Sequence, residues 1–220
     1  GSMHLHKAVG RVHNLKGISL PGMRGIAHTR WATHGKPSDR NAHPFVDEDN
    51  QFAIVHNGII ENYLELKEQL RKQGGNFSSD TDSEVLVHLI AKHYEGDLLQ
   101  ATLKTIARLQ GAYAFCVLHK ESNELIGARN GSPLVLGIGR NEHFLASDVS
   151  ALVEHTKQVI YLNDFEVARL SPEGYAVFSF QGQPLSPHVA QVQWDIEQTQ
   201  KQGYKHFMLK EIFEQPAVVQ

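Results

Sequence analysis

The 220-residue chain has little cysteine, little net charge and no long apolar run. Its single cysteine, Cys116, excludes an internal disulfide framework and fits a reducing compartment. The net charge of −3 gives no overall basic field, which argues against nucleic-acid binding. No stretch approaches the roughly 20 apolar residues that cross a bilayer, and the N-terminus lacks the apolar core of a signal peptide. Together these absences predict a cytoplasmic protein without a membrane partner.

The composition, 41% hydrophobic and 20% charged, suits one globular domain with a sizeable core. Helical patterns are grouped between residues 60 and 108, whereas short β-rich runs separated by turn signals dominate after Gly111. This grouping predicts the α+β class. Strands are expected at residues 8–12, 25–29, 52–55, 113–118, 124–129, 134–138, 143–146, 159–161, 165–170 and 175–180.

Four helices are expected. Apolar residues recur every three or four positions over residues 60–73, which predicts the first helix. Thr81-Asp82-Ser83-Glu84 has the spacing of a capping box and predicts the start of the second. Asp97 predicts the cap of a third helix, and a further helical pattern covers residues 204–213.

Two short apolar runs break off into polar residues that carry chemistry. The run at residues 25–29 leads into Arg30-Trp31-Ala32-Thr33-His34, and the run at residues 52–55 leads into His56-Asn57-Gly58. Buried strands that end in this way deliver functional groups to their tips. The Asn57-Gly58 pair suits a sharp turn, and the polar stretch from Gly35 to Asn50 reads as a loop over the site. The polar groups after the two runs suit a site that binds a ligand carboxylate at one point and stabilises a developing oxyanion at another.

Several longer segments follow one another in a specific order. They are His28-Thr29-Arg30-Trp31-Ala32-Thr33-His34-Gly35, Asn41-Ala42-His43-Pro44, His56-Asn57-Gly58-Ile59-Ile60-Glu61-Asn62, Thr81-Asp82-Ser83-Glu84-Val85, Lys205-His206-Phe207-Met208 and Glu214-Gln215-Pro216. From about Val12 onward the chain resembles the glutaminase domain of the glutamine–fructose-6-phosphate aminotransferase (glucosamine-6-phosphate synthase) family. The resemblance implies a class II N-terminal-nucleophile amidotransferase. It also implies a four-layer αββα sandwich, here incomplete at its N-terminus.

Arg30 is the candidate anchor for the α-carboxylate of glutamine, because a guanidinium offers two parallel charge-assisted hydrogen bonds in fixed geometry. Taken alone it would read as a surface arginine in an ion pair. By resemblance, Thr33 and His34 line the same pocket, and Trp31 belongs to a mobile loop that closes over glutamine.

Asp82 is the candidate anchor for the α-ammonium group. An aspartate at a helix start usually serves the helix, but Thr81 is available for that cap, which would leave the Asp82 carboxylate to face the pocket. Asn57 and Gly58 resemble the family's oxyanion hole, through a side-chain N–H and a backbone N–H. Outside this context the pair would read as an ordinary turn.

Histidine is abundant, with 14 residues, and four of them, His28, His34, His43 and His56, crowd one region. No HExxH or paired-cysteine spacing accompanies them, so neither a metal nor a cofactor is expected. His43 is expected to bind substrate by shaping the pocket, and His56 to stand beside it. Neither is assigned as a general base.

The family's nucleophile is a terminal cysteine whose own α-amino group acts as base. Cys116 is no replacement, because it lies in an apolar strand pattern where cysteine behaves as a small buried hydrophobe. The expected organisation is a cloning scar at residues 1–3, with Met3 either part of it or the start of the natural segment. An N-terminally truncated glutaminase domain is expected at residues 4–199. Residues 200–220 are expected to be a linker toward a sugar-phosphate isomerase domain that is absent here.

The expected function is therefore that of the glutamine-binding half of such an enzyme. The full enzyme would release ammonia for transfer to fructose 6-phosphate, and this chain would be inactive without the nucleophile. Its expected partners are glutamine, the isomerase domain of the same polypeptide and further copies in a homo-oligomer. Another class II amidotransferase, making phosphoribosylamine or asparagine, is an alternative. A non-catalytic glutamine-binding or interaction module is a second.

Overall fold

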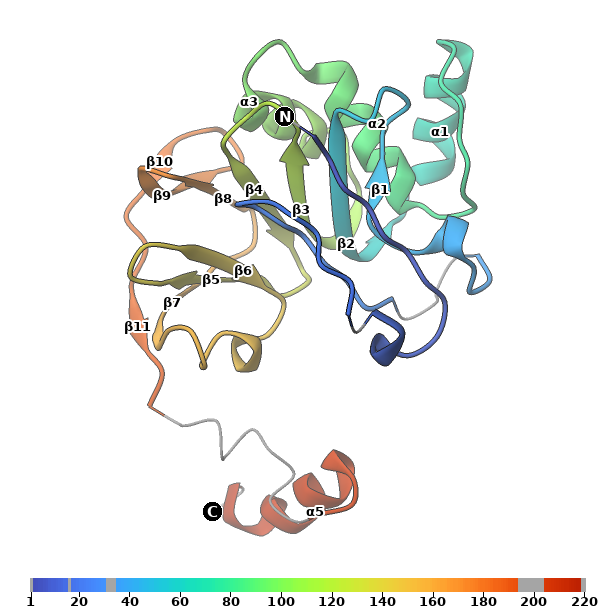
Figure 1. Ribbon diagram of the computed structural model, residues 1–220. Coiled ribbons are helices and arrows are strands. Elements are labelled where there is room, and N and C mark those ends of the chain that lie inside the picture. The colour runs from blue at the N-terminus through green and yellow to red at the C-terminus, as the bar shows by residue number, and fades with distance from the viewer. Residues whose placement is uncertain (1, 16, 31–34, 194–203, 219–220) are drawn as a thin grey trace.

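The computed structural model describes residues 2–15, 17–30, 35–193 and 204–218, and its main body holds two antiparallel sheets (Figure 1). The larger sheet has the strand order β1 (Phe45–Val46), β2 (Phe52–Ile60), β3 (Gly111–His119), β4 (Leu125–Asn130), β8 (Glu166–Ser171), β9 (Gly174–Ser179) and β10 (Pro184–Leu185). The smaller has the order β11 (Ala190–Gln191), β7 (Gln158–Tyr161), β5 (Val135–Ile138) and β6 (His143–Ala146).

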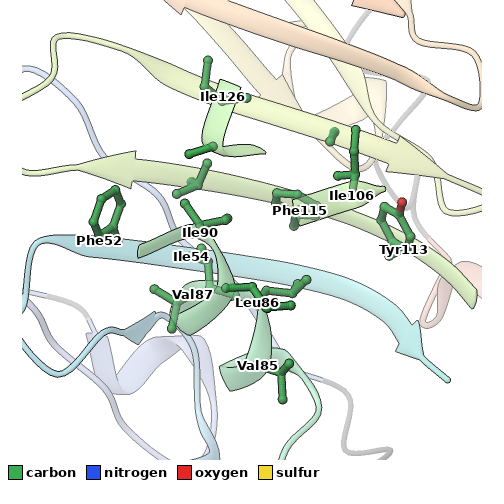
Figure 2. Close-up of a cluster of buried hydrophobic side chains, with 14 of the residues drawn as sticks. Phe52, Ile54, Val85, Leu86, Val87, Ile90, Ile106, Tyr113, Phe115 and Ile126 are labelled. Carbon is green, nitrogen blue, oxygen red and sulfur yellow. The ribbon is translucent and has the colours of Figure 1, made fainter. Parts of the chain in front are cut away.

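Three α-helices, α1 (Tyr63–Lys72), α2 (Ser83–His93) and α3 (Leu98–Ile106), cover one face of the larger sheet. Residues 83–90 of α2 are all buried, as expected for a helix that contacts α1, α3 and the strands β1 and β2 at once. Figure 2 shows this core, where Ile54 and Phe115 of the sheet meet Leu86 and Ile90 of α2. This packing fixes the position of β2, which carries part of the site.

The opposite face of the larger sheet packs on the smaller sheet. Because side chains alternate along a strand, Val55 points away from the helices and joins a cluster with Cys116, Leu136 and Ile160 between the sheets. The outer face of the smaller sheet is covered by residues that follow the short 3₁₀ helix η3 (Val149–Ala151). Helices, two sheets and this thin outer layer confirm the α+β class.

Two predicted strands are wrong. Residues 8–12 lead into the 3₁₀ helix η1 (Val12–Leu15), and residues 25–29 form no strand. Ile26 does pack against the cluster between the sheets, as its apolar character suggests. A strand also needs a neighbour for its backbone N–H and C=O groups, however, and the described residues place none in register with this segment.

The strand at residues 52–55 was predicted too short. β2 continues to Ile60, because β3 pairs with each of its nine residues, from Phe52 opposite His119 to Ile60 opposite Gly111. Asn57 and Gly58 therefore lie within a strand and not in a sharp turn. In the predicted loop at residues 35–50, a 3₁₀ helix η2 (Asp39–Asn41) and the short strand β1 were missed.

The predicted helices are present with shifted bounds. Asp97 caps α3 as expected, accepting a hydrogen bond from the backbone N–H of Gln100. The C-terminal pattern corresponds to α5 (Phe207–Val218), which lies apart from the sheets in Figure 1. None of the helices in the described ranges is both long enough and apolar enough to span a bilayer.

Candidate active site

Three segments distant along the chain meet at the C-terminal end of β2. His28 reaches it from the N-terminal segment, where its Nε2 lies 2.8 Å from Oδ1 of Asn57. Asp82 reaches it from the start of α2, where its Oδ2 accepts a hydrogen bond of 2.8 Å from the backbone N–H of Ile60. The residues around Arg30, Asn57 and Asp82 are therefore joined by direct contacts.

Asn57 is exposed, and its amide is oriented by His28. An amide oxygen only accepts hydrogen bonds, so Nε2 of His28 carries the proton in this contact. Burial lowers the pKa of His28 more than its hydrogen bond to Asn57 raises it, so the ring is neutral at neutral pH. With the oxygen engaged, Nδ2 is the end of the Asn57 amide that remains to donate.

Gly58 adopts a conformation that only glycine tolerates here. Its φ is +106°, and a Cβ at this position would lie 2.1 Å from the carbonyl oxygen of Ala112. The backbone thus departs from regular strand geometry next to Asn57 while keeping its place opposite Tyr113 of β3.

Asp82 does not serve as the side-chain cap of α2. It occupies the N-cap position but makes no capping hydrogen bond, and only 3% of its surface is exposed. Its carboxylate instead holds the backbone of β2 through Ile60, two residues beyond Gly58. The alternative, that the Asp82 side chain caps the helix, is therefore wrong. The second carboxylate oxygen is a further acceptor that a ligand ammonium group can use.

The predicted capping box is wrong in its partners. Glu84 turns back to the residues before the helix, and its two oxygens accept backbone hydrogen bonds of 2.7 Å from Ser78 and Ser79. Burial alone would raise the pKa of Glu84, but the hydrogen-bond donors around it outweigh burial and lower its pKa to about 2. Lys67 fixes the same turn by donating to the carbonyl oxygen of Ser79. The entry to α2 is thus anchored independently of Asp82.

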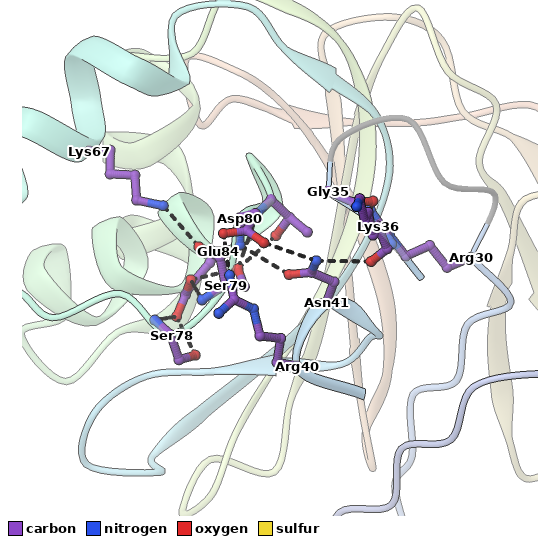
Figure 3. A network of polar contacts seen from close by, with 11 residues as sticks. Arg30, Gly35, Lys36, Arg40, Asn41, Lys67, Ser78, Ser79, Asp80 and Glu84 are labelled. Carbon is purple, nitrogen blue, oxygen red and sulfur yellow. Dashed lines mark hydrogen bonds and ion pairs between the residues drawn. The ribbon is translucent and has the colours of Figure 1, made fainter. Parts of the chain in front are cut away.

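Arg30 lies on the same side of the fold as this turn (Figure 3). Its Nη2 donates to the carbonyl oxygen of Gly35, whose Cα lies beside Asn41 and Asp80. Buried Asn41 ties the two loops together, because its Oδ1 accepts from the backbone N–H of Asp80 while its Nδ2 donates to the Lys36 carbonyl oxygen.

His43 and His56 are buried beside the meeting point. The ring of His43 lies 4.0 Å from that of His28 and packs edge-on against Phe45. Burial, reinforced by nearby positive groups, lowers the pKa of His43 to about 2. Burial also lowers the pKa of His56 to about 4, although Asp82 opposes the shift, and Nδ1 of His56 lies 2.8 Å from the Ser83 hydroxyl. Both rings are neutral packing groups, which suits a role in shaping the pocket.

A model of the glutamine amidotransferase domain matches residues 28–154. The chain belongs to this family. A glutamine–fructose-6-phosphate aminotransferase [isomerizing] of Aquifex aeolicus is 52% identical over the whole chain, which covers 38% of that protein. One from Thermus thermophilus is 50% identical over 91% of the chain and 33% of its own length. The chain thus spans about a third of the length of these curated relatives.

A solved structure shows the same fold. The glutamine phosphoribosylpyrophosphate amidotransferase of B. subtilis, solved with ADP and GMP, is 31% identical with a TM-score of 0.60. The match covers 70% of this chain and 34% of that one. It confirms the predicted α+β sandwich of the N-terminal-nucleophile type for the amidotransferase domain.

Cys116 lies within β3, opposite Val55 of β2. Its side chain faces the cluster between the sheets, 8% of its surface is exposed, and burial raises the pKa of the thiol to about 12. A thiol in this environment is neither ionised nor reachable by substrate, as the strand pattern predicted. In the described parts of the chain, no cluster of three or more His, Cys, Asp or Glu side chains could hold a metal.

Of the predicted site residues, Trp31, Thr33 and His34 lie outside the described residues. Two residues that organise the site were given no role from sequence, namely His28 and Asn41. His28 shares one face of an extended segment with Arg30, two positions on, and this spacing was the available signal. Asn41 lies two residues before His43 in the segment Asn41-Ala42-His43-Pro44. Its contact with Asp80 depends on how two loops distant in the sequence approach each other, which no local sequence pattern predicts.

Two hollows on the described part of the surface lie elsewhere. One of about 540 Å³ lies beside Glu121 and Glu173, at the opposite end of the sheet. Another of about 450 Å³ lies beside Glu84 and His88. Neither is lined by Arg30, Asn57 or Asp82.

Proposed function

We propose that the chain is the glutamine-binding unit of a glutamine–fructose-6-phosphate aminotransferase, in which the full polypeptide moves the amide nitrogen of glutamine to fructose 6-phosphate. The observation that carries the proposal is the convergence of the Arg30, Asn57 and Asp82 segments at the end of β2. The 52% identity over the whole chain to a relative of that name supports the choice of acceptor. An isomerase domain in the same polypeptide, a homo-oligomer and a cytoplasmic location belong to the same proposal.

In this function Arg30 and Asp82 hold the two charged groups on the α-carbon of glutamine. The guanidinium pairs with the α-carboxylate through two parallel hydrogen bonds, and the Asp82 carboxylate accepts from the α-ammonium group. Asp82 also holds Ile60, so the ammonium anchor is connected to the strand that carries the oxyanion donors. By resemblance the proposal also assigns substrate binding to His43 and to Trp31, Thr33 and His34, the last three of which lie outside the described residues.

Hydrolysis then follows from the position of the side-chain amide. A cysteine thiolate adds to the amide carbon, and the resulting oxyanion accepts hydrogen bonds from Nδ2 of Asn57 and the backbone N–H of Gly58. The α-amino group of that cysteine passes the thiol proton to the amide nitrogen, so that ammonia leaves and a thioester forms. Water then cleaves the thioester to glutamate and regenerates the thiol. Removing one oxyanion donor typically costs about 100- to 1000-fold in rate.

The thiolate in that step is the terminal cysteine of the family and not Cys116, whose thiol is buried and un-ionised. The chain with the sequence printed above is therefore proposed to bind glutamine without hydrolysing it. Binding and hydrolysis can be measured separately, which makes this part of the proposal directly testable.

Calorimetric titration with L-glutamine tests the pocket. Saturable binding is expected, and Arg30→Ala is expected to weaken it about 30-fold, because a charge-assisted bidentate contact is lost. Arg24→Ala is the matched control: Arg24 lies in the same segment but donates to the carbonyl oxygens of His119 and Glu124. No ammonia release is expected with or without Cys116→Ala. Equal effects of the two arginine variants, or turnover abolished by Cys116→Ala, would overturn the assignment.

The likeness to the B. subtilis enzyme keeps a second class II amidotransferase as the alternative. The longer polypeptide that contains this chain should form glucosamine 6-phosphate from glutamine and fructose 6-phosphate. Formation of phosphoribosylamine from phosphoribosylpyrophosphate instead would favour the alternative. Glutamine binding without any ammonia release by the longer polypeptide would favour a non-catalytic glutamine-binding module.

A further inference from the structure

The orientation of the Asn57 amide depends on one neighbour. A side-chain amide has a donor end and an acceptor end of nearly the same shape, so the hydrogen-bond partner decides which end faces the ligand. Here the partner is Nε2 of His28 at 2.8 Å from Oδ1. An oxyanion hole requires the donor end to face the ligand, and this contact leaves Nδ2 for that purpose.

The His28 ring is itself held by a row of packed rings. Its centroid lies 4.0 Å from that of His43, and His43 packs edge-on against Phe45 at 4.8 Å. Phe45 is 2% exposed and belongs to β1, where it pairs with Ile54 of β2. The row therefore returns to the same strand that carries Asn57, and the imidazole and the amide share one rigid support.

We propose that His28 is a positioning residue for glutamine hydrolysis, donating from Nε2 to Asn57 so that the Asn57 amide presents its N–H to the oxyanion. The inference rests on the proposed function and deepens it. His28 lies two residues before Arg30, so the carboxylate anchor and the oxyanion donor are supported by one segment. A shift of that segment moves both.

The tautomer of His28 tests the orientation directly. In the ¹⁵N-labelled chain at pH 7, two-bond ¹H–¹⁵N correlation spectra distinguish a proton on Nε2 from one on Nδ1, and the spectrum of His28→Gln identifies the His28 signals. A neutral ring with its proton on Nε2 is expected. A proton on Nδ1 would overturn the proposal, because Nε2 would then accept from Asn57 and the amide oxygen would face the ligand.

A pair of ligands tests the consequence. L-glutamate carries a negative oxygen where the oxyanion would form, whereas L-glutamine carries a neutral amide there. His28→Phe keeps a ring without a donor, and His28→Gln keeps a donor of similar reach. Calorimetry is expected to show that His28→Phe weakens glutamate binding about tenfold more than glutamine binding, and that His28→Gln restores the difference.

Equal loss for both ligands, with no restoration by His28→Gln, would reduce His28 to a structural residue and overturn the proposal. Failure of the unmodified chain to bind either amino acid would instead defeat the proposed function. In that event the tautomer of His28 still decides, without any ligand, whether this residue orients Asn57.

Discussion

β2 and the segment at residues 25–30 each carry part of the proposed glutamine site, but only β2 belongs to a sheet. All nine residues of β2 pair with β3, and the strand is covered by α2 on one face and by the smaller sheet on the other. Residues 25–30 have no strand partner among the described residues. They are held by side chains, with Ile26 in the cluster between the sheets and His28 on Asn57.

The difference separates two ways of placing a functional group. In β2 the position of Asn57 is fixed by backbone pairing and by the core, so a disturbance there changes the stability of the domain. In the segment, Arg30 is placed by a few local contacts, which are individually worth about 1 kcal/mol. A disturbance there should change ligand binding and leave the fold intact.

The largest effect is expected for Gly58→Ala. The added Cβ would meet the Ala112 carbonyl oxygen and would sit at a φ of +106°, so we expect a loss of about 4 kcal/mol in the free energy of unfolding and loss of glutamine binding. Gly25→Ala is the matched change in the segment, where the new Cβ has nothing within 4 Å. Urea unfolding of both variants measures the contrast.

Similar destabilisation by the two substitutions would mean that the segment is also part of the cooperative fold. If Gly58→Ala left the free energy of unfolding unchanged, β2 would be able to shift away from Ala112 at this point. Pairing with β3 would then not fix the position of Asn57 more firmly than side-chain contacts fix residues 25–30.

A second pair of variants compares isoleucines. Ile54 of β2 is fully buried under α2, so Ile54→Ala is expected to cost about 3 kcal/mol through lost transfer energy and a residual cavity. Ile26 is partly buried at the edge of the cluster between the sheets, and Ile26→Ala should cost about 1 kcal/mol. Thermal and urea unfolding give both values, and an equal cost would place the segment within the core.

The sequence predicted best those elements whose partners are close along the chain. The helix over residues 60–73 was recognisable from its apolar stripe, and the strands after Gly111 were recognisable as short β-rich runs separated by turn signals. Asp97 was recognisable as a cap because its partner, Gln100, is three residues away. The strand at residues 25–29 was wrong for the opposite reason: its alternation is that of a strand, but pairing depends on a neighbour that periodicity does not reveal.

In the candidate site, too, some features were predicted from the sequence and others were not. Arg30, Asn57, Gly58 and Asp82 were selected by type and by resemblance, and their placement in one region agrees with that selection. The hydrogen bond from Ile60 to Asp82 was beyond sequence reasoning, because it joins residues 22 positions apart at a strand end whose extent was itself underestimated. Their binding roles remain predictions until a ligand is measured.

The smallest effect is expected from His43, which lies between the two halves and contacts both His28 and Phe45. Its pKa is lowered to about 2 in the folded chain by burial, against about 6.5 in the unfolded chain. Between these two pH values the unfolded chain binds more protons than the folded chain. The free energy of unfolding is therefore highest above pH 6.5 and decreases as the pH falls below it. From pH 6.5 to 5.5 the unfolding free energy should fall by about 1 kcal/mol through this residue.

His43→Phe should flatten this slope, since it keeps an aromatic ring between His28 and Phe45 but removes the titrating group. His28, His56, His93 and His119 contribute to the slope in both proteins, because burial lowers the pKa of each. Glu84 acts only below the ordinary pKa of a carboxyl group. The difference between the two urea-unfolding profiles therefore isolates His43. An unchanged slope would show that His43 protonates without unfolding the domain. The packed rings of His28, His43 and Phe45 would then have to separate locally while β2 stays paired with β3.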